Sequence, residues 1–145
     1  MFASIIVCSD GSEHALKAAR VAAEIASRFD SEVCLLCVET FAPISPALFT
    51  GSLTYDTQEA LESLEDAQRS AERRTGKVFE AMGVRYRCLR EVGHAVDRIV
   101  AVAEQERADL IVLGSRGLGS FQRLLLGSVS DGVLHHAHCP VLVVR

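Results

Sequence analysis

Residues 110–117 read LIVLGSRG, an apolar run that leads directly into a glycine-rich loop. Four successive apolar residues, Leu110–Leu113, are typical of a strand covered on both faces, as the central strands of a parallel sheet are. After the loop, a helix-like segment begins near Ser128, and apolar runs alternate with helical patterns through the rest of the chain. This alternation indicates an α/β fold built on a parallel sheet.

Working outward from this stretch, the pattern predicts a single domain over residues 1–145. The strands are expected over Ser4–Ser9, Val33–Val38, Val84–Cys88, Leu110–Leu113 and Pro140–Val144. The helices are expected over about Ser12–Phe29, Asp56–Met82, Ala95–Glu106 and Val129–His136. Apolar residues alternate with Arg in Val84–Cys88, so this strand should lie at an edge of the sheet. Right-handed crossovers then favour a five-stranded parallel sheet of order 3-2-1-4-5 with helices on both faces.

That strand order predicts where a ligand would bind. The winding direction reverses between the first and the fourth strand, and open α/β sheets bind ligands at such a reversal, beyond the carboxyl ends of the strands. The segments Ser9–Ser12 and Gly114–Ser130 are therefore expected to carry the site. The long connection Glu39–Asp56 should project from the same edge, where it either covers a ligand, contacts another subunit or simply moves.

Composition excludes several classes of protein. The 145 residues are 49% hydrophobic, and 15 Lys plus Arg against 19 Asp plus Glu give a formal net charge of −4. A chain of this length builds its core without disulfide or zinc cross-links. Its acidic balance argues against a general binder of nucleic acid or of anionic membranes. The apolar run Ile5–Cys8 is too short for a signal peptide or a membrane span, so a cytoplasmic location is expected.

All five cysteines are interpreted as buried small hydrophobic residues in a reducing compartment. They are Cys8, Cys34, Cys37, Cys88 and Cys139. Cys34 and Cys37 have the spacing of a CxxC motif, but both lie inside the strand expected over Val33–Val38. Because residues three apart in a strand point to opposite faces, these two thiols are not expected to share a metal ion.

The glycine-rich segment after the fourth strand has the features of an anion site. Glycine lets main-chain N–H groups approach an anion without a β-carbon in the way. Ser128 and Asp131 have the spacing of a capping box, so a helix is expected to begin at Ser128 with its positive end in the crevice. Residues 110–130 contain no Asp or Glu but two arginines, Arg116 and Arg123. The alternative is that the glycines only turn the chain and the capped helix binds nothing.

Two common phosphate motifs are excluded by their spelling. A Walker A loop needs Lys and then Ser or Thr after its last glycine, whereas Ser120 and Phe121 follow Gly119. The dinucleotide motif GxGxxG fails because Gln122 stands where its third glycine is needed. A Walker A site and a hydride-transfer enzyme are therefore not expected.

The spacing that is present is Gly, two residues, Gly, nine residues and Gly-Ser, at Gly114, Gly117, Gly127 and Ser128. It resembles the ATP-binding signature of the universal stress protein family. The resemblance extends over the whole chain, from SDGS at residues 9–12 to CPVLVV at 139–144. It implies the five-stranded fold derived above, a homodimer, and ATP with Mg²⁺ in the crevice.

The resemblance also implies roles for individual residues. Gly114 and Gly117 would line the ribose and phosphates, and Gly127–Ser130 would wrap the triphosphate with N–H and hydroxyl donors. Asp10 would lie beside the sugar or a phosphate-bound Mg²⁺, although a carboxylate before a helix can also be only a cap. Val38 would present main-chain groups to the adenine. The full candidate set is Cys8, Ser9, Asp10, Val38, Leu113, Gly114, Arg116, Gly117, Gly127, Ser128, Val129 and Ser130.

The closing strand predicts an interface. Pro140–Val144 is almost purely apolar, yet the expected strand order leaves it at an edge, and a bare apolar edge invites uncontrolled pairing. We therefore expect its twofold mate to cover it in a homodimer, as the family resemblance also implies.

The interpretation that these features favour is a cytoplasmic ATP-binding regulator whose nucleotide occupancy tunes partner binding. A slow ATPase and a nucleotide-free dimeric scaffold are the alternatives. No catalytic residue is assigned, because no nucleophile with a base and an orienting partner is recognisable. His135, His136 and His138 are expected to complement the negative end of the last helix and to lie away from the crevice.

Overall fold

The computed structural model describes residues 1–40, 54–117 and 126–145. In chain order the elements are β1 (Ser4–Cys8), α1 (Glu13–Phe29), β2 (Glu32–Glu39), α2 (Thr54–Ala81), β3 (Tyr86–Val92), α3 (Ala95–Gln105), β4 (Leu110–Gly114), α4 (Ser128–His136) and β5 (Val141–Val144). The strands form one sheet of order β3-β2-β1-β4-β5, and every neighbouring pair is parallel. The predicted fold class and strand order are confirmed.

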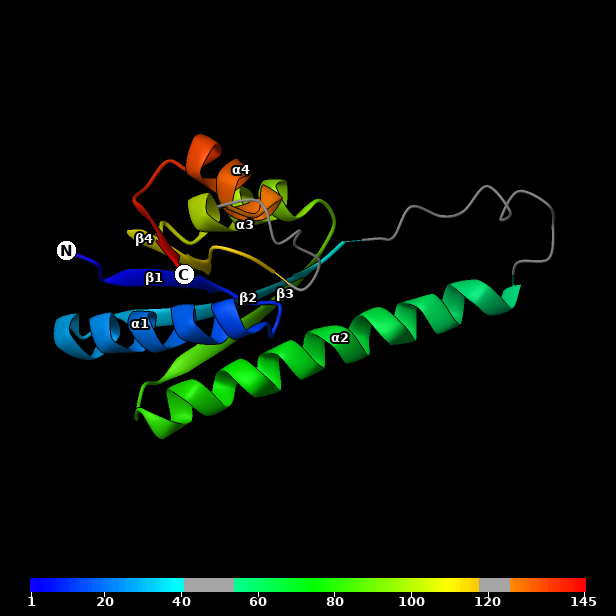
Figure 1. Cartoon of the computed structure of the whole chain (residues 1–145), viewed down its shortest axis with the longest axis horizontal. Coiled ribbons are helices and arrows are strands. Elements are labelled where there is room, and N and C mark those ends of the chain that lie inside the picture. Colours follow the sequence, from blue (N-terminus) through cyan, green and yellow to red (C-terminus); the bar gives the residue numbers. More distant parts are fainter. Residues whose placement is uncertain (41–53, 118–125) are drawn as a thin grey trace.

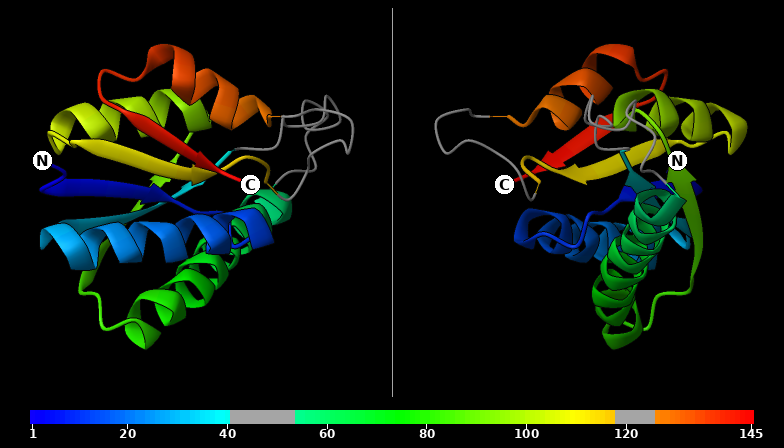
Figure 2. Two further views of the ribbon diagram at one scale, coloured as in Figure 1. Left: turned by 60° about the vertical axis from the view of Figure 1, so that its left-hand side comes forward. Right: turned by 90° about the vertical axis from the view of Figure 1, so that its right-hand side faces the viewer.

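Helices cover both faces of the sheet. Helices α1 and α2 lie on one face and α3 and α4 on the other (Figure 1). The strands point the same way, and α1 and α4 both begin at the end where the strand tips lie (Figure 2). The fold therefore places two helix N-termini beside the carboxyl ends of the central strands.

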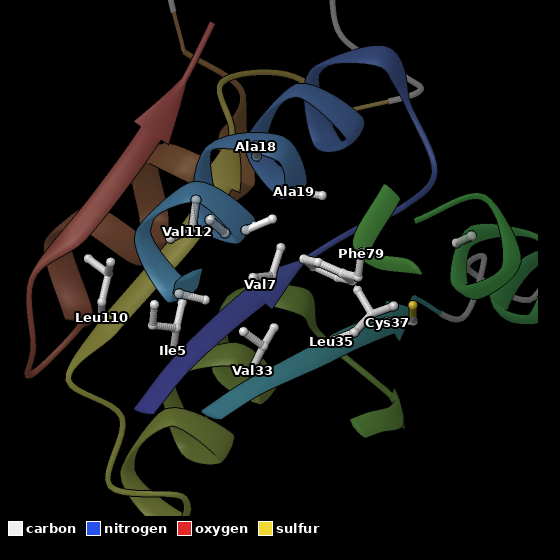
Figure 3. Close-up of a cluster of buried hydrophobic side chains, with 14 residues drawn as sticks. Ile5, Val7, Ala18, Ala19, Val33, Leu35, Cys37, Phe79, Leu110 and Val112 are labelled. Carbon is white, nitrogen blue, oxygen red and sulfur yellow. The ribbon is translucent and has the colours of Figure 1, made fainter. Parts of the chain in front are cut away.

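The core follows from the alternation of side chains along the buried strands. In β1, Ile5 and Val7 point into the cluster beneath α1 and α2, whereas Ile6 points into the cluster beneath α3 and α4. All three are fully buried, as expected for a central strand. Small side chains of α1, among them Ala18 and Ala19, let this helix approach the sheet closely (Figure 3).

The third strand lies at the edge, as predicted, but it begins later than expected. It runs over Tyr86–Val92 instead of Val84–Cys88. The amide of Val84 donates to Phe79 O at 2.9 Å, and Gly83 has a φ of +67°. Both features belong to the turn that ends α2, so Val84 closes the helix and is not free to join the sheet.

The cysteine prediction is only partly right. Cys8, Cys34 and Cys37 are buried, whereas Cys88 and Cys139 are partly exposed because they lie on the two edges of the domain. Cys34 and Cys37 belong to the clusters on opposite faces of the sheet, as the strand period predicted. Burial raises the pKa of the Cys37 thiol to about 12, which keeps it protonated and unreactive.

No helix in the described ranges is both long and apolar enough to cross a membrane. Strand β5 is the other edge of the sheet and is half-buried throughout. Most of the connection expected to project from the ligand edge, residues 41–53, lies outside the described residues.

Candidate functional site

The turn after β1 holds Asp10 in a defined position. The amide of Ser12 donates to Asp10 Oδ1 at 2.9 Å, and the Ser12 hydroxyl caps α1 by accepting from the amide of Ala15 at 3.3 Å. Gly11 has a φ of +78°, which a residue with a β-carbon rarely adopts. Asp10 is half-buried. One of its carboxylate oxygens thus completes the turn, and Oδ2 faces the loop after β4.

Ser9 is turned inward. Its side chain is buried, and its hydroxyl accepts from the amide of Gly11 at 3.1 Å and lies 2.6 Å from Thr75 Oγ1. The hydroxyl of this candidate ligand-binding residue is therefore engaged inside the protein. What Ser9 contributes at the strand tip is the placement of the neighbouring Asp10.

The loop after β4 meets this turn. A β-carbon built on Gly117 would lie 2.5 Å from Asp10 Oδ2, so the loop backbone lies directly against the carboxylate. Arg116 is half-buried beside it. The structure thus brings the two segments that the strand order singled out into contact, across the reversal between β1 and β4.

The glycine at the end of β4 has a structural reason. A β-carbon on Gly114 would lie 2.7 Å from His14 C and 2.8 Å from Ala15 N. The space that the missing side chain leaves is occupied by the backbone of α1. Gly114 therefore allows α1 to begin close to β4, and its neighbour in the structure is protein rather than an open ligand space.

Ser115 organises the site, and sequence reasoning missed it. It is 1% exposed, and its hydroxyl lies 3.1 Å from His14 Nδ1. Its amide donates to Val144 O at 2.7 Å, and its carbonyl accepts from the amide of Gly127 at 2.6 Å. The Ser–His pair has the elements of a nucleophile with its base, but the buried hydroxyl cannot reach a substrate. The sequence signal available was its position between Gly114 and Gly117.

The start of α4 differs from the expected capping box. Gly127 is the N-cap, and no side chain caps the helix, because the first helical residue is Ser128 itself. The Ser130 hydroxyl is buried and donates inward, with Gly127 O at 2.9 Å and Ser115 O at 3.1 Å. Two donors expected to reach a phosphate, the Ser130 hydroxyl and the Gly127 amide, are thus used within the protein.

The amides that remain are those of the first turn of α4. The first hydrogen bond of the helix runs from the Asp131 amide to Gly127 O, at 3.0 Å. The amides of Ser128, Val129 and Ser130 precede it, and such amides have no acceptor within their own helix. Ser128 and Val129 are exposed. With the positive end of the helix dipole, these groups form a place suited to an anion.

The apolar candidates form one side of the strand tips. Cys8 and Leu113 are buried in the cluster beneath α3 and α4, and the half-buried Val38 packs against the same cluster. Burial raises the pKa of the Cys8 thiol far above its usual range, so Cys8 stays a neutral apolar neighbour. These residues offer apolar surface and, at Val38, main-chain groups near the sheet edge.

Glu39 is a second acidic residue at the tips that sequence reasoning did not assign. It ends β2, next to Val38, and it is half-buried. Partial burial, and then the nearby negative charge of Asp10, raise the pKa of its carboxyl group. The two carboxylates repel each other, so this side of the site favours a cation or hydroxyl groups over a bare anion.

Two of the three histidines expected at the end of the last helix, His135 and His136, lie in the last turn of α4. Nδ1 of His135 and Nδ1 of His136 each lie 2.8 Å from a carbonyl one turn earlier, Asp131 O and Gly132 O. These two carbonyls lie in the middle of α4, where they also accept hydrogen bonds of the helix itself, so these ring contacts do not cap the last carbonyls of the helix.

Known proteins resemble the whole chain. The model of the family described as "Universal stress protein family" matches residues 1–145. A universal stress protein of Thermus aquaticus is 37% identical over 145 residues, which is 100% of both chains. Universal stress protein UspA from Lactobacillus plantarum has a solved structure with a TM-score of 0.84 and 28% identity, covering 99% of this chain and 98% of that one. A universal stress protein solved in complex with cAMP has a TM-score of 0.71 and 27% identity, covering 98% and 96%.

Proposed function

The chain belongs to the universal stress protein family, and from this premise we propose that it is a regulatory protein that binds an adenine nucleotide. ATP with Mg²⁺ is the proposed ligand, and its occupancy tunes binding to a protein partner. Hydrolysis is not part of the proposed function. Ser115, which pairs with His14, is buried and supplies no accessible nucleophile, which is consistent with a binding role.

The observation that carries the proposal is the exposed first turn of α4 beside the Asp10 turn. Ser115 O holds the N-cap Gly127 through a 2.6 Å hydrogen bond, and Gly117 lies against Asp10. The amides of Ser128 and Val129 are thereby tied to the loop that leaves the tip of β4 and contacts Asp10. Fixed main-chain donors at a helix N-terminus suit phosphate oxygens.

The acidic pair supports a nucleotide that carries a cation. Asp10 and Glu39 would repel an uncompensated triphosphate, whereas carboxylates together with phosphate oxygens are typical ligands of Mg²⁺. Bound there, Mg²⁺ would neutralise phosphate charge. Asp10, whose Oδ1 is held by the Ser12 amide, is already positioned for this role or for a ribose hydroxyl.

The adenine part of the proposal has two supports. Val38 and Leu113 supply apolar surface at the tips of β2 and β4, and the main chain at Val38 can discriminate a base by hydrogen bonds. A structural relative was solved with cAMP, which carries adenine, ribose and phosphate. We therefore propose adenine over other bases.

We further propose a cytoplasmic homodimer joined through β5. The edge strand Val141–Val144 is apolar and only half-buried in one chain. Pairing with a second copy would satisfy its outer main-chain groups and bury its side chains. Five free thiols fit a reducing compartment.

The decisive experiment removes one main-chain donor. Ser128 is the first residue of α4, where proline is well tolerated, and the preceding Gly127 has extended backbone with φ −74° and ψ 159°. Ser128→Pro should therefore keep the helix but delete the amide, and Ser128→Ala should delete only the hydroxyl. We expect Ser128→Pro to weaken ATP–Mg²⁺ binding at least about tenfold in calorimetry, and Ser128→Ala to weaken it less.

Each outcome separates the proposal from its alternatives. Equal affinity of Ser128→Pro and the parent protein would mean that the α4 amides do not bind the ligand. Absence of binding to ATP, ADP and cAMP by the parent protein would favour the nucleotide-free scaffold. Release of phosphate that is lost in Asp10→Asn would favour the slow ATPase.

A further inference from the structure

Helix α2 presents two buried polar side chains to the sheet. Among its described side chains, Gln68 is 4% exposed and Thr75 is 0% exposed. They are seven residues apart, two turns of helix, so they lie on one face, with the buried Ala71 between them. A polar side chain in such surroundings is retained where its hydrogen bonds are satisfied, so their partners indicate what they do.

Thr75 is bonded to the turn that carries Asp10. Its hydroxyl donates to Ala71 O at 2.7 Å, so its single proton is used within α2. The Ser9 hydroxyl, 2.6 Å away, must then donate to Thr75 Oγ1, while it accepts from the Gly11 amide at 3.1 Å. The result is one directed chain of hydrogen bonds from the Gly11 amide to Ala71 O, in which each bond polarises the next.

The backbone of α2 supports the same turn. A β-carbon on Gly11 would lie 3.1 Å from Ala71 Cα, so the turn rests directly on the helix. Gly11 is the residue after Asp10, and its positive φ leaves little freedom to adjust. A shift of α2 at this level therefore moves the turn or breaks the hydrogen-bond chain.

Gln68 reaches the two neighbouring strand ends. Its Nε2 donates to Glu91 O at 2.7 Å and to Cys37 O at 3.4 Å. These carbonyls lie near the carboxyl ends of β3 and β2, and Cys37 directly precedes Val38. One face of α2 thus holds the tips of β1, β2 and β3, and the helix extends well past the sheet beyond this contact (Figure 1).

We infer that Gln68 and Thr75 are positioning residues that set Asp10 and Val38 for the ligand, so that the placement of α2 and nucleotide affinity are coupled. This inference rests on the proposed function, because it concerns the same site. Neither residue touches the ligand. By linkage, whatever shifts α2 changes nucleotide affinity, and bound nucleotide in turn stabilises this placement of α2.

The test compares Thr75→Val, which keeps the shape and removes the hydroxyl, with Thr75→Ser, which keeps the hydroxyl. Ser70→Ala is the matched control, since Ser70 is an exposed hydroxyl on the same helix. We expect Thr75→Val to weaken ATP–Mg²⁺ binding about five- to tenfold, Thr75→Ser to restore most of it, and Ser70→Ala to bind like the parent. Thr75→Val binding with the parent affinity would overturn the inference.

A second readout needs no ligand. Amide hydrogen exchange in the free protein should be faster at Gly11 in Thr75→Val than in the parent or in Thr75→Ser, and equal rates would overturn the inference. If the parent binds no nucleotide, the proposed function fails, and the exchange rates at Gly11 still decide whether α2 holds the strand tips. Circular dichroism confirms that each variant compared is folded.

Discussion

Gly117 faces the carboxylate of Asp10 so closely that a β-carbon on the glycine would lie 2.5 Å from Asp10 Oδ2. The two residues come from loops more than one hundred positions apart, at the tips of β1 and β4. Glycine is needed here because a side chain would push the carboxylate away. The glycine of the loop and the acid of the first turn therefore form one unit of the site.

Gly117→Ala should move the Asp10 side chain without disturbing the fold, because the atom it meets is the end of a side chain. We expect ATP–Mg²⁺ affinity to fall about tenfold while the free energy of unfolding changes by less than about 1 kcal/mol. Calorimetry and urea unfolding measure the two effects. If the change acts through Asp10, adding Gly117→Ala to Asp10→Ala should cost little more, whereas additive losses would contradict it.

Gly114→Ala should act mainly on stability. The new β-carbon would meet the backbone of α1, 2.7 Å from His14 C, and backbone cannot yield as a side chain does. We expect a loss of about 1–3 kcal/mol in urea unfolding. Gly117→Ala is the control, because it makes the same chemical change three residues further along the chain. A Gly114→Ala protein of parental stability that no longer binds nucleotide would instead mean that the β-carbon occupies ligand space.

Cys37 should make the protein less stable at high pH. Burial raises the pKa of its thiol from 9.0 to about 12, so above pH 9 the unfolded chain loses this proton before the folded one does. The contribution of this thiol to the free energy of unfolding is therefore complete below pH 9. It falls by up to about 1.4 kcal/mol per pH unit as the pH rises toward 12. Urea unfolding from pH 8 to 11 measures the slope. The loss of stability per pH unit should be smaller in Cys37→Ala than in Cys139→Ala, because the Cys139 thiol that the second variant removes is already partly exposed in the folded parent protein.

Glu39→Gln should stabilise the free protein at neutral pH. Burial and the charge of Asp10 raise the pKa of Glu39, so the folded state holds this proton more tightly than the unfolded state. Ionisation with rising pH then lowers stability, and glutamine avoids this loss. Thermal melts should show a higher Tm for the variant at pH 7 and a smaller difference near pH 4, where the carboxyl group is protonated. A lower Tm at pH 7 would show that the charged form makes favourable contacts.

The β5 edge offers a clean test of the proposed dimer. Pro140 O and Val144 O accept from β4, so by the alternation of a parallel ladder the main-chain groups of Val143 point outward. Val143→Pro should remove one outward donor without breaking the bonds to β4. We expect a dimer for the parent and for Val143→Ala, and a monomer for Val143→Pro, in sedimentation. A dimeric proline variant would place the interface elsewhere.

Much of the fold was predictable from local pattern. The continuous apolar runs of β1, β2 and β4 and the alternating β3 each report how many faces of a strand are buried, and crossover handedness then leaves few strand orders. Cys34 and Cys37 are also close together in the sequence. Their position on opposite faces of the sheet therefore follows from the strand period alone. The bounds of β3 were wrong, because the turn that ends α2 takes Val84 and the strand continues to Val92. The expected burial of Cys88 and Cys139 and the expected capping box of α4 were wrong as well.

The sequence by itself determined the sheet, the edge at which a ligand would bind and the glycine spacing that resembles one family, because periodicity and spacing are properties of neighbouring residues. Only the tertiary structure decided what each site group faces. The hydroxyls of Ser9 and Ser130 turn inward, Ser115 joins β4 to α4, and Thr75 reaches a turn 66 residues away. These contacts join segments that are far apart in the chain, and packing alone selects which donor keeps its partner inside the protein and which is left for a ligand.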